Sequence, residues 1–141
     1  MATVTLYHYT CSHHVDRIAA DGALLSIRGQ ALAARKSVAI HPLGSAWGWM
    51  FDAVWLTDLP TLADPSVLGL RGYRGSCDRS EWRYTVDTAD ATPWLRFARS
   101  IPAYQRHLAR GTEPWHWWIL PGSVPVDQAP VHRPGLRPPA C

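Results

Sequence analysis

The chain of 141 residues contains little cysteine. Its three cysteines, Cys11, Cys77 and Cys141, are widely spaced and form no C-x-x-C pair. Such a set neither cross-links a small secreted domain nor supplies the paired thiolates of a zinc site. We therefore expect no metal site, and we expect the reducing environment of the cytoplasm.

Long apolar runs are also missing. No stretch approaches the roughly 18 apolar residues that a membrane-spanning helix needs, and residues 1–9 lack the basic start and apolar centre of a signal peptide. With 47% hydrophobic and 18% charged residues, the composition is that of a globular chain. These observations predict a soluble cytoplasmic protein with no membrane partner, and the length favours one domain.

Lysine and glutamate are scarce. Lys36 is the one lysine among 14 basic residues, and the only glutamates are Glu81 and Glu113. Arginine forms better forks on phosphate and carboxylate groups than lysine does, and GC-rich codons enrich the same residue type. The net charge of +3 permits an acidic partner such as a nucleic acid or a dinucleotide without requiring one.

The first 22 residues have the pattern of a strand followed by a helix. Val4, Leu6 and His8 alternate with polar or aromatic residues, which predicts a strand over residues 3–9. Ser12 is the expected N-cap of the helix. Helically spaced apolar residues then continue to a glycine at position 22, a residue that commonly ends helices.

The middle of the chain contains a long irregular stretch and several predicted strands. Residues 26–52 lack a regular pattern, and we expect a mobile loop over a ligand there. Short strands are predicted at 54–57 and 67–70. The most regular strand is predicted at 81–87, where Glu81 lies on the face opposite the strand's apolar residues.

Helices and short strands are predicted for the rest of the chain. Thr92 and Pro93 indicate the start of a helix, which continues or is followed by a second one up to Gly111. Residues 115–120 are apolar on both faces and predict an interior strand, and residues 124–126 allow a last short one. The order of elements predicts an α+β fold with a mainly antiparallel sheet and a few helices.

The domain is expected to span residues 1–129. Residues 130–141 are rich in proline and arginine and predict a loose tail. Arginines 96, 99, 106 and 110 share one side of the predicted helices, with tryptophans nearby. This side is either a solvated face or a surface for a nucleic-acid partner.

Three motifs in order along the chain carry a resemblance to a known family. Leu6-Tyr-His-Tyr-Thr10 ends the first strand, Val54-Trp-Leu-Thr57 forms a later strand, and Ser80-Glu-Trp-Arg-Tyr-Thr-Val86 begins a strand with a glutamate. Together they resemble the ADP-ribosyltransferase-like superfamily, in particular the branch of DarT-type and poly-ADP-ribose polymerase-like enzymes. The resemblance covers residues 4–87.

The resemblance implies a split sheet and NAD⁺ as the substrate. His8 would donate a hydrogen bond to the ribose at the nicotinamide end, and Glu81 would be the catalytic carboxylate. Trp55 would pack on nicotinamide where the family usually has a tyrosine. A carboxylate suits this chemistry because cleavage of the N-glycosidic bond develops positive charge on the ribose.

Three more residues are candidates for contacts with NAD⁺. Tyr9 lies within the first motif. Thr10 would bind the nucleotide or cap the turn into the helix, and Arg79 would bind the pyrophosphate or pair with Asp78.

Two other functions are compatible with the same fold. One is an RNA 2′-phosphotransferase-like enzyme, which needs a basic pocket for a terminal phosphate. The other is a catalytically silent module that binds NAD⁺, nucleic acid or protein. For a transferase, the acceptor is a nucleic acid, a protein or a small molecule.

Overall fold

The computed structural model describes residues 2–26, 53–68, 79–100 and 113–133. These ranges form a mostly antiparallel six-stranded sheet, a two-stranded sheet and a few short helices, which confirms the predicted α+β class. In chain order the elements are β1 (Val4–Thr10), α1 (Ser12–Asp21), β2 (Ala23–Leu24), β3 (Ala53–Thr57), the 3₁₀ turn η1 (Pro65–Leu68), β4 (Trp82–Thr88), β5 (Thr92–Pro93), α4 (Trp94–Phe97), η3 (Ala98–Ser100), η5 (Pro114–His116), β6 (Trp117–Pro121), β7 (Val124–Pro125) and β8 (Val131–His132).

The centre of the large sheet is the antiparallel pair β1 and β4. The strand order is β5-β6-β3-β1-β4-β8. β1 and β4 pair along the whole of β1, from Val4↔Thr88 to Thr10↔Trp82. Both strands alternate in sequence, so each presents one apolar row to the core and one mixed row to the other face.

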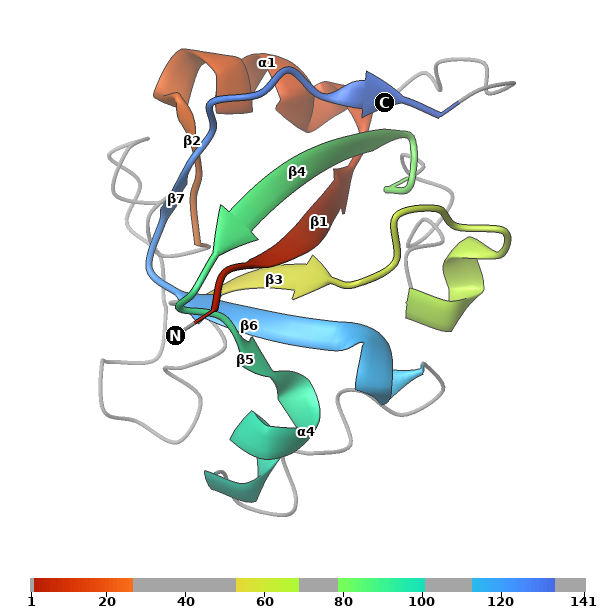
Figure 1. Cartoon of the computed structure of the whole chain (residues 1–141). Coiled ribbons are helices and arrows are strands. Elements are labelled where there is room, and N and C mark those ends of the chain that lie inside the picture. The colour runs from red at the N-terminus through yellow and green to blue at the C-terminus, as the bar shows by residue number, and fades with distance from the viewer. Residues whose placement is uncertain (1, 27–52, 69–78, 101–112, 134–141) are drawn as a thin grey trace, which may run out of the picture.

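β1 and β3 are neighbours that meet at one register pair, Tyr7↔Thr57. β3 pairs instead with β6 along its full length, from Ala53↔Pro121 to Thr57↔Trp117. The two halves of the sheet, β4 with β1 and β3 with β6, diverge from each other in Figure 1. Beyond Tyr7↔Thr57, the described residues of β1 and β3 form no further register pair.

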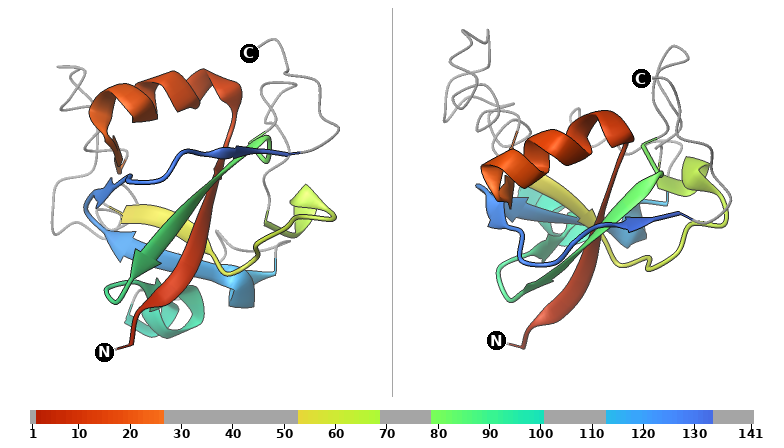
Figure 2. Two further views of the ribbon diagram at one scale, coloured as in Figure 1. Left: turned by 45° about the horizontal axis from the view of Figure 1, so that its top comes forward. Right: turned by 90° about the horizontal axis from the view of Figure 1, so that it is seen from above.

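Two apolar clusters cover opposite faces of the sheet. Figures 1 and 2 show α1 lying across β1 and β4, with α4 at the opposite side of the molecule against β5 and β6. The smaller cluster, beside α4, consists of Ala53, Trp94, Ala98 and Ile119. The larger cluster joins α1, β2 and β7 to the sheet and consists of Leu6, Ile18, Leu24, Val54, Leu56, Tyr84, Val86, Leu120 and Val124.

Helix α1 begins at Ser12, the residue that was expected to be its N-cap. Cys11 occupies the N-cap position with an extended backbone and no side-chain capping bond. The expectation that Ser12 is the cap is therefore wrong, because Ser12 is already the first residue of the helix. Gly22 ends the helix as predicted, at φ 65° in the left-handed region that glycine favours.

Three other predicted elements differ from the structure because proline changes the local backbone. The strand expected at 67–70 is wrong where described, since Pro65 starts the 3₁₀ turn η1 instead. Thr92 and Pro93 form the short strand β5, and the helix begins after them. Pro114 starts η5, so the strand expected from Trp115 begins two residues later and Trp115 is exposed.

The first residues after the expected domain boundary contact the sheet. Val131 and His132 form β8 and pair with Arg83 and Trp82 of β4. Arg133 follows β8 and is held beside the sheet by its N–H, which donates to the carbonyl oxygen of Glu81, and by its side chain, which donates to Ser80.

Some expectations lie outside the described residues. These are the loop at 27–52, the helix between 101 and 112, and the tail from 134 onward. Within the part that the structure describes, no helix combines the length and the apolarity needed to cross a membrane.

Candidate functional site

A cavity of about 370 Å³ lies where β1 and β3 diverge. We call it the β1–β3 cavity. Five of the six residues singled out from the sequence line it, and they come from β1, from β3 and from the residues before β4. Its full lining is Tyr7, His8, Tyr9, Thr10, His14, Trp55, Thr57, Leu68, Arg79 and Trp117.

His8 is held in one orientation by the backbone of β3. Its Nδ1 lies 3.0 Å from the carbonyl oxygen of Trp55. Because a carbonyl oxygen only accepts, Nδ1 carries the proton and donates, and Nε2 of the neutral ring keeps a lone pair. Burial lowers the pKa of His8 below 6.5, and nearby His14 lowers it further, against the opposing effect of the Trp55 bond. The free nitrogen of His8 is therefore a hydrogen-bond acceptor near neutral pH.

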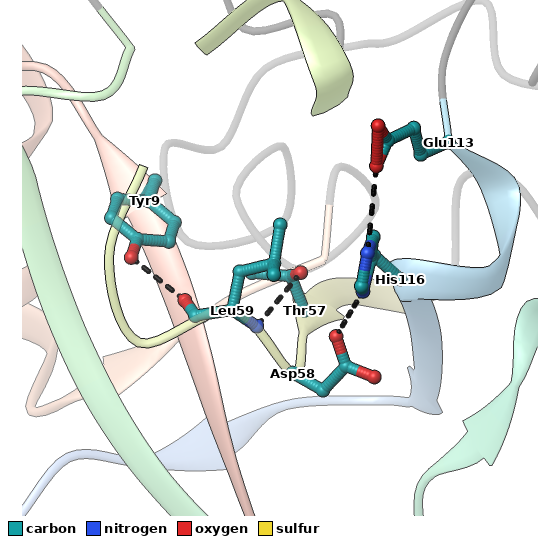
Figure 3. A network of polar contacts seen from close by, with 6 residues as sticks. All are labelled: Tyr9, Thr57, Asp58, Leu59, Glu113 and His116. Atoms are coloured by element: carbon teal, nitrogen blue, oxygen red, sulfur yellow. Dashed lines mark hydrogen bonds and ion pairs between the residues drawn. The ribbon is translucent and has the colours of Figure 1, made fainter. Parts of the chain in front are cut away.

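Tyr9 is anchored across the end of β3. Its hydroxyl donates to the carbonyl oxygen of Leu59 at 2.8 Å (Figure 3). Burial raises the pKa of Tyr9 to about 12, in keeping with a phenol that stays protonated and donates. The phenol ring therefore has a defined position at the edge of the β1–β3 cavity.

The chain beyond β3 is held by a short polar network. Leu59 N–H donates to the hydroxyl oxygen of Thr57 at 3.3 Å. His116 lies between two carboxylates, with Nδ1 2.7 Å from Asp58 and Nε2 3.5 Å from Glu113 (Figure 3). These contacts tie the turn after β3 to η5, and so they fix the carbonyl that anchors Tyr9.

Trp55 lies between the cavity and the smaller apolar cluster. Its ring centroid is 5.2 Å from that of Trp94 and 5.4 Å from that of Trp117, the latter edge to face. These contacts hold the indole ring in place by packing. Trp55 is thus a core residue and a cavity wall at once, a combination that the sequence pattern alone does not distinguish.

The first turn of α1 adds a histidine that sequence reasoning left out of the site. The hydroxyl of Thr10 lies 3.3 Å from Nδ1 of His14, and both residues line the cavity. Thr10 therefore contacts the helix through a side chain, but it is not the cap. The spacing of four residues across a strand-to-helix turn was the available signal for His14.

Arg79 is exposed and lines the cavity close to His14. Burial lowers the pKa of His14, and the positive charges of His13, Arg17 and Arg79 lower it as well. Arg79 therefore supplies positive charge at the cavity edge. Its alternative partner Asp78 lies outside the described residues.

Glu81 is fully buried and binds the start of α1. Its carboxylate accepts from the backbone N–H of Ser12 at 3.2 Å and from the Ser12 hydroxyl at 2.6 Å. Nε2 of His132 lies 3.3 Å from the same carboxylate. A negative charge at a helix N-terminus is favourable because unpaired N–H groups and the helix dipole meet there. In this structure Glu81 thus links β4, α1 and β8.

Glu81 does not line the β1–β3 cavity. It lines a second cavity of about 280 Å³, which we call the β4–β8 cavity. Tyr9 lines both, and it is the one residue that the two linings share. The structure therefore gathers five candidate residues in one cavity and places the sixth in another, and Tyr9 lines both.

Comparisons of this chain with protein-family models, with curated proteins and with solved structures found no match. The geometry of the two cavities is thus the basis for a function.

Proposed function

We propose that this chain is an ADP-ribosyltransferase-like domain that binds NAD⁺ in the β1–β3 cavity. The proposal is supported above all by one observation: His8, Tyr9, Thr10, Trp55 and Arg79 come from three separate segments and line one cavity. Residues that position a dinucleotide must converge in this way.

The contacts suggest a role for each part of the cavity. Nε2 of His8 accepts a hydrogen bond from a ribose hydroxyl, rather than donating one as the resemblance implies. Trp55 supplies an aromatic wall for the nicotinamide ring, whose positive charge favours an indole face. Arg79 supplies a fork of N–H donors for the pyrophosphate.

Transfer requires a carboxylate close to the ribose. In the proposed reaction the bond between ribose C1′ and nicotinamide nitrogen breaks, nicotinamide leaves as a neutral molecule, and an acceptor nucleophile bonds to C1′ and loses its proton. Glu81 would stabilise the positive charge that develops on the ribose. Because Tyr9 lines both cavities, we expect a ligand that reaches from His8 to Glu81 to contact Tyr9.

A second candidate function is a module that binds NAD⁺ without turning it over. It is favoured by the contacts of Glu81, whose buried carboxylate is already bonded to Ser12 and His132. In this case Glu81 holds the fold together and the β1–β3 cavity alone takes the ligand.

NAD⁺ binding is tested by thermal unfolding with increasing NAD⁺. Ligand at about 100 times its dissociation constant stabilises the native state by roughly 2.7 kcal/mol. We expect His8→Ala to lose most of this stabilisation. His13→Ala is the matched control, because His13 is an exposed histidine at the start of α1 that does not line the cavity. An unchanged melting temperature in the parent protein at millimolar NAD⁺ contradicts the proposal.

Turnover separates the two candidates. Nicotinamide release, followed by chromatography, is expected from the transferase and not from the binding module. If release occurs, Glu81→Gln should slow it by about 10²–10³-fold, the usual cost of losing a group that stabilises transition-state charge. Binding without release supports the silent module.

Whether the acceptor is a nucleic acid is tested by measuring the affinity for single-stranded DNA and RNA at two salt concentrations. Arg96 and Arg99 are exposed on α4 and η3 and supply positive charge there. If these groups contact phosphates, the logarithm of affinity falls by about 0.7 per contact for each unit in the logarithm of salt. The absence of binding at low salt removes nucleic acid as the acceptor.

A further inference from the structure

The β4–β8 cavity carries two arginines that the proposed function does not use. Arg83 lies on β4, and Arg133 follows β8 directly. The cavity is lined by Tyr9, Pro60, Thr61, Leu62, Ser80, Glu81, Arg83, Val131, His132 and Arg133, all of them described residues.

Neither arginine has an acidic partner among the described residues. Arg83 donates from Nη1 to the carbonyl oxygen of Pro60, and its guanidinium lies over the ring of Tyr7, 5.1 Å from the centroid. Its Nε is buried and has no hydrogen-bond partner. Arg133 donates from Nη1 to the hydroxyl oxygen of Ser80 at 2.7 Å. Both cations are thus held in place by neutral groups that leave their charge uncompensated.

Arg83 and Arg133 line the β4–β8 cavity together with Tyr9. Both lie close enough to its phenol to oppose the increase in pKa that burial causes. The one carboxylate of the cavity, Glu81, is bonded to Ser12 and His132 and not to either arginine. The lining therefore contains two guanidinium groups and one carboxylate.

We propose that the β4–β8 cavity is a phosphate-binding site, with Arg83 and Arg133 as its ligands. Two planar guanidinium groups present several N–H donors to one anion, and arginine suits phosphate through this fork geometry. A bound phosphate also supplies the negative charge that the pair lacks. This site is separate from the β1–β3 cavity and does not depend on NAD⁺ binding or turnover there.

A phosphate group reaches the cavity from one of two sources. One is the pyrophosphate of a dinucleotide that extends from the β1–β3 cavity, in which case Arg83 and Arg133 bind it in place of Arg79. The other is a phosphate of a nucleic acid. The recognising chemistry is the same in both cases, so the first test uses the inorganic anions.

The test is thermal unfolding and ³¹P NMR line broadening with sodium pyrophosphate and with sodium phosphate, each compared with sodium chloride at equal ionic strength. The parent protein should be stabilised by the phosphate anions beyond the effect of chloride. Arg133→Gln and Arg83→Gln should each weaken binding roughly tenfold or more, the usual effect of losing a charged hydrogen bond. Arg133→Lys keeps the positive charge but loses the forked pair of N–H donors. Its affinity for the phosphate anions should lie between that of the glutamine variants and that of the parent.

Arg17→Gln is the matched control, because it removes one positive charge from an exposed position on α1 and does not line this cavity. It should bind both anions like the parent protein. Equal responses in all four variants, or no response beyond chloride in the parent, overturn the proposal. If a glutamine variant fails to fold, Arg133→Lys and the NMR measurement on the parent decide the outcome.

Two arms distinguish the sources once binding of the anions is established. If Arg133→Lys weakens binding of NAD⁺ but not of a single-stranded oligonucleotide, the site takes the dinucleotide pyrophosphate. The reverse result assigns it to nucleic acid. Failure of NAD⁺ to bind at all removes the proposed function and leaves the phosphate site to be decided by the inorganic anions.

Discussion

At the scale of single residues, Glu81 is a buried carboxylate with two partners. Ser12 donates to it twice, and His132 contacts it from β8. The indole N–H of Trp82 donates to the Ser12 hydroxyl at 2.9 Å, which extends the network by one more bond. A carboxylate placed in this way holds three elements together whether or not it takes part in a reaction.

Glu81→Gln should therefore lower the stability of the fold, in addition to slowing any reaction that Glu81 catalyses. The neutral amide keeps one acceptor oxygen, but it loses the charge beside the helix N-terminus and turns an N–H₂ group toward Ser12 or His132. We expect a loss of about 1–3 kcal/mol in the free energy of unfolding, measured by urea denaturation near neutral pH.

Glu113→Gln is the matched control for this experiment. Glu113 is the other glutamate, is partly exposed, and makes a longer contact of 3.5 Å with His116. Its substitution should cost less than about 1 kcal/mol, as is usual for exposed ion pairs. Equal effects of the two substitutions would show that the buried network around Glu81 contributes nothing special to stability.

At the scale of elements, the end of α1 depends on one backbone conformation. Gly22 has φ 65°, its N–H donates to the carbonyl of Ile18, and its carbonyl accepts from Val126 N–H. A Cβ added to Gly22 would meet no atom within 4 Å, so space is not limiting. A side chain there is opposed by the left-handed backbone alone.

Gly22→Ala should thus lower the free energy of unfolding by about 1 kcal/mol, since the strain of a left-handed alanine exceeds the gain from a stiffer unfolded chain. Gly22→Asn should cost less, because asparagine tolerates this conformation better. The measurement is urea denaturation of both variants.

Gly122 provides a parallel case in the turn between β6 and β7. It has φ 79°, and a Cβ there also meets nothing within 4 Å. Gly122→Ala should cost about as much as Gly22→Ala. If alanine proved neutral or stabilising at both positions, the backbone conformations assigned to these turns would be wrong.

At the scale of the whole molecule, stability should decline in mild acid. The pKa values of His8 and His14 are lowered from 6.5 in the folded protein, mainly by burial. Below pH 6.5 the unfolded chain therefore binds protons that the folded chain does not, and stability falls as the pH decreases toward the folded pKa values. Above pH 6.5 both histidines are neutral in the folded and the unfolded chain, so these two groups contribute no pH dependence to the stability.

The urea midpoint measured from about pH 8 down to about pH 5 checks this expectation. His8→Gln should flatten the acid limb, because an amide can donate to the Trp55 carbonyl without titrating in this range. His13→Gln, which alters an exposed histidine, should flatten the limb far less, because it removes only a secondary contribution to the lowered pKa of His14. A midpoint that rises on acidification would contradict the assignment of His8 as a neutral donor.

Local sequence patterns determined much of the fold of this protein. Alternation placed β1 and β4 within one residue of their observed bounds, and Gly22 marked the end of α1. These signals work because the periods of strands and helices, and the freedom of glycine, act within a few residues. The prediction is wrong near the prolines at 65 and 114, because each starts a 3₁₀ turn where the apolar pattern predicts a strand.

Only the tertiary structure decided how the candidate residues are arranged. Sequence alone predicted one site with His8, Trp55 and Glu81 together. The single pair between β1 and β3 opens a cavity around His8, while the pairing of β8 with β4 brings His132 and Arg133 to Glu81 instead. Such contacts join residues 47 and 51 positions apart, and they depend on strand register and on the packing of Tyr9 between the two cavities. A local pattern carries no information about either, because both are set by the long-range fit of whole elements.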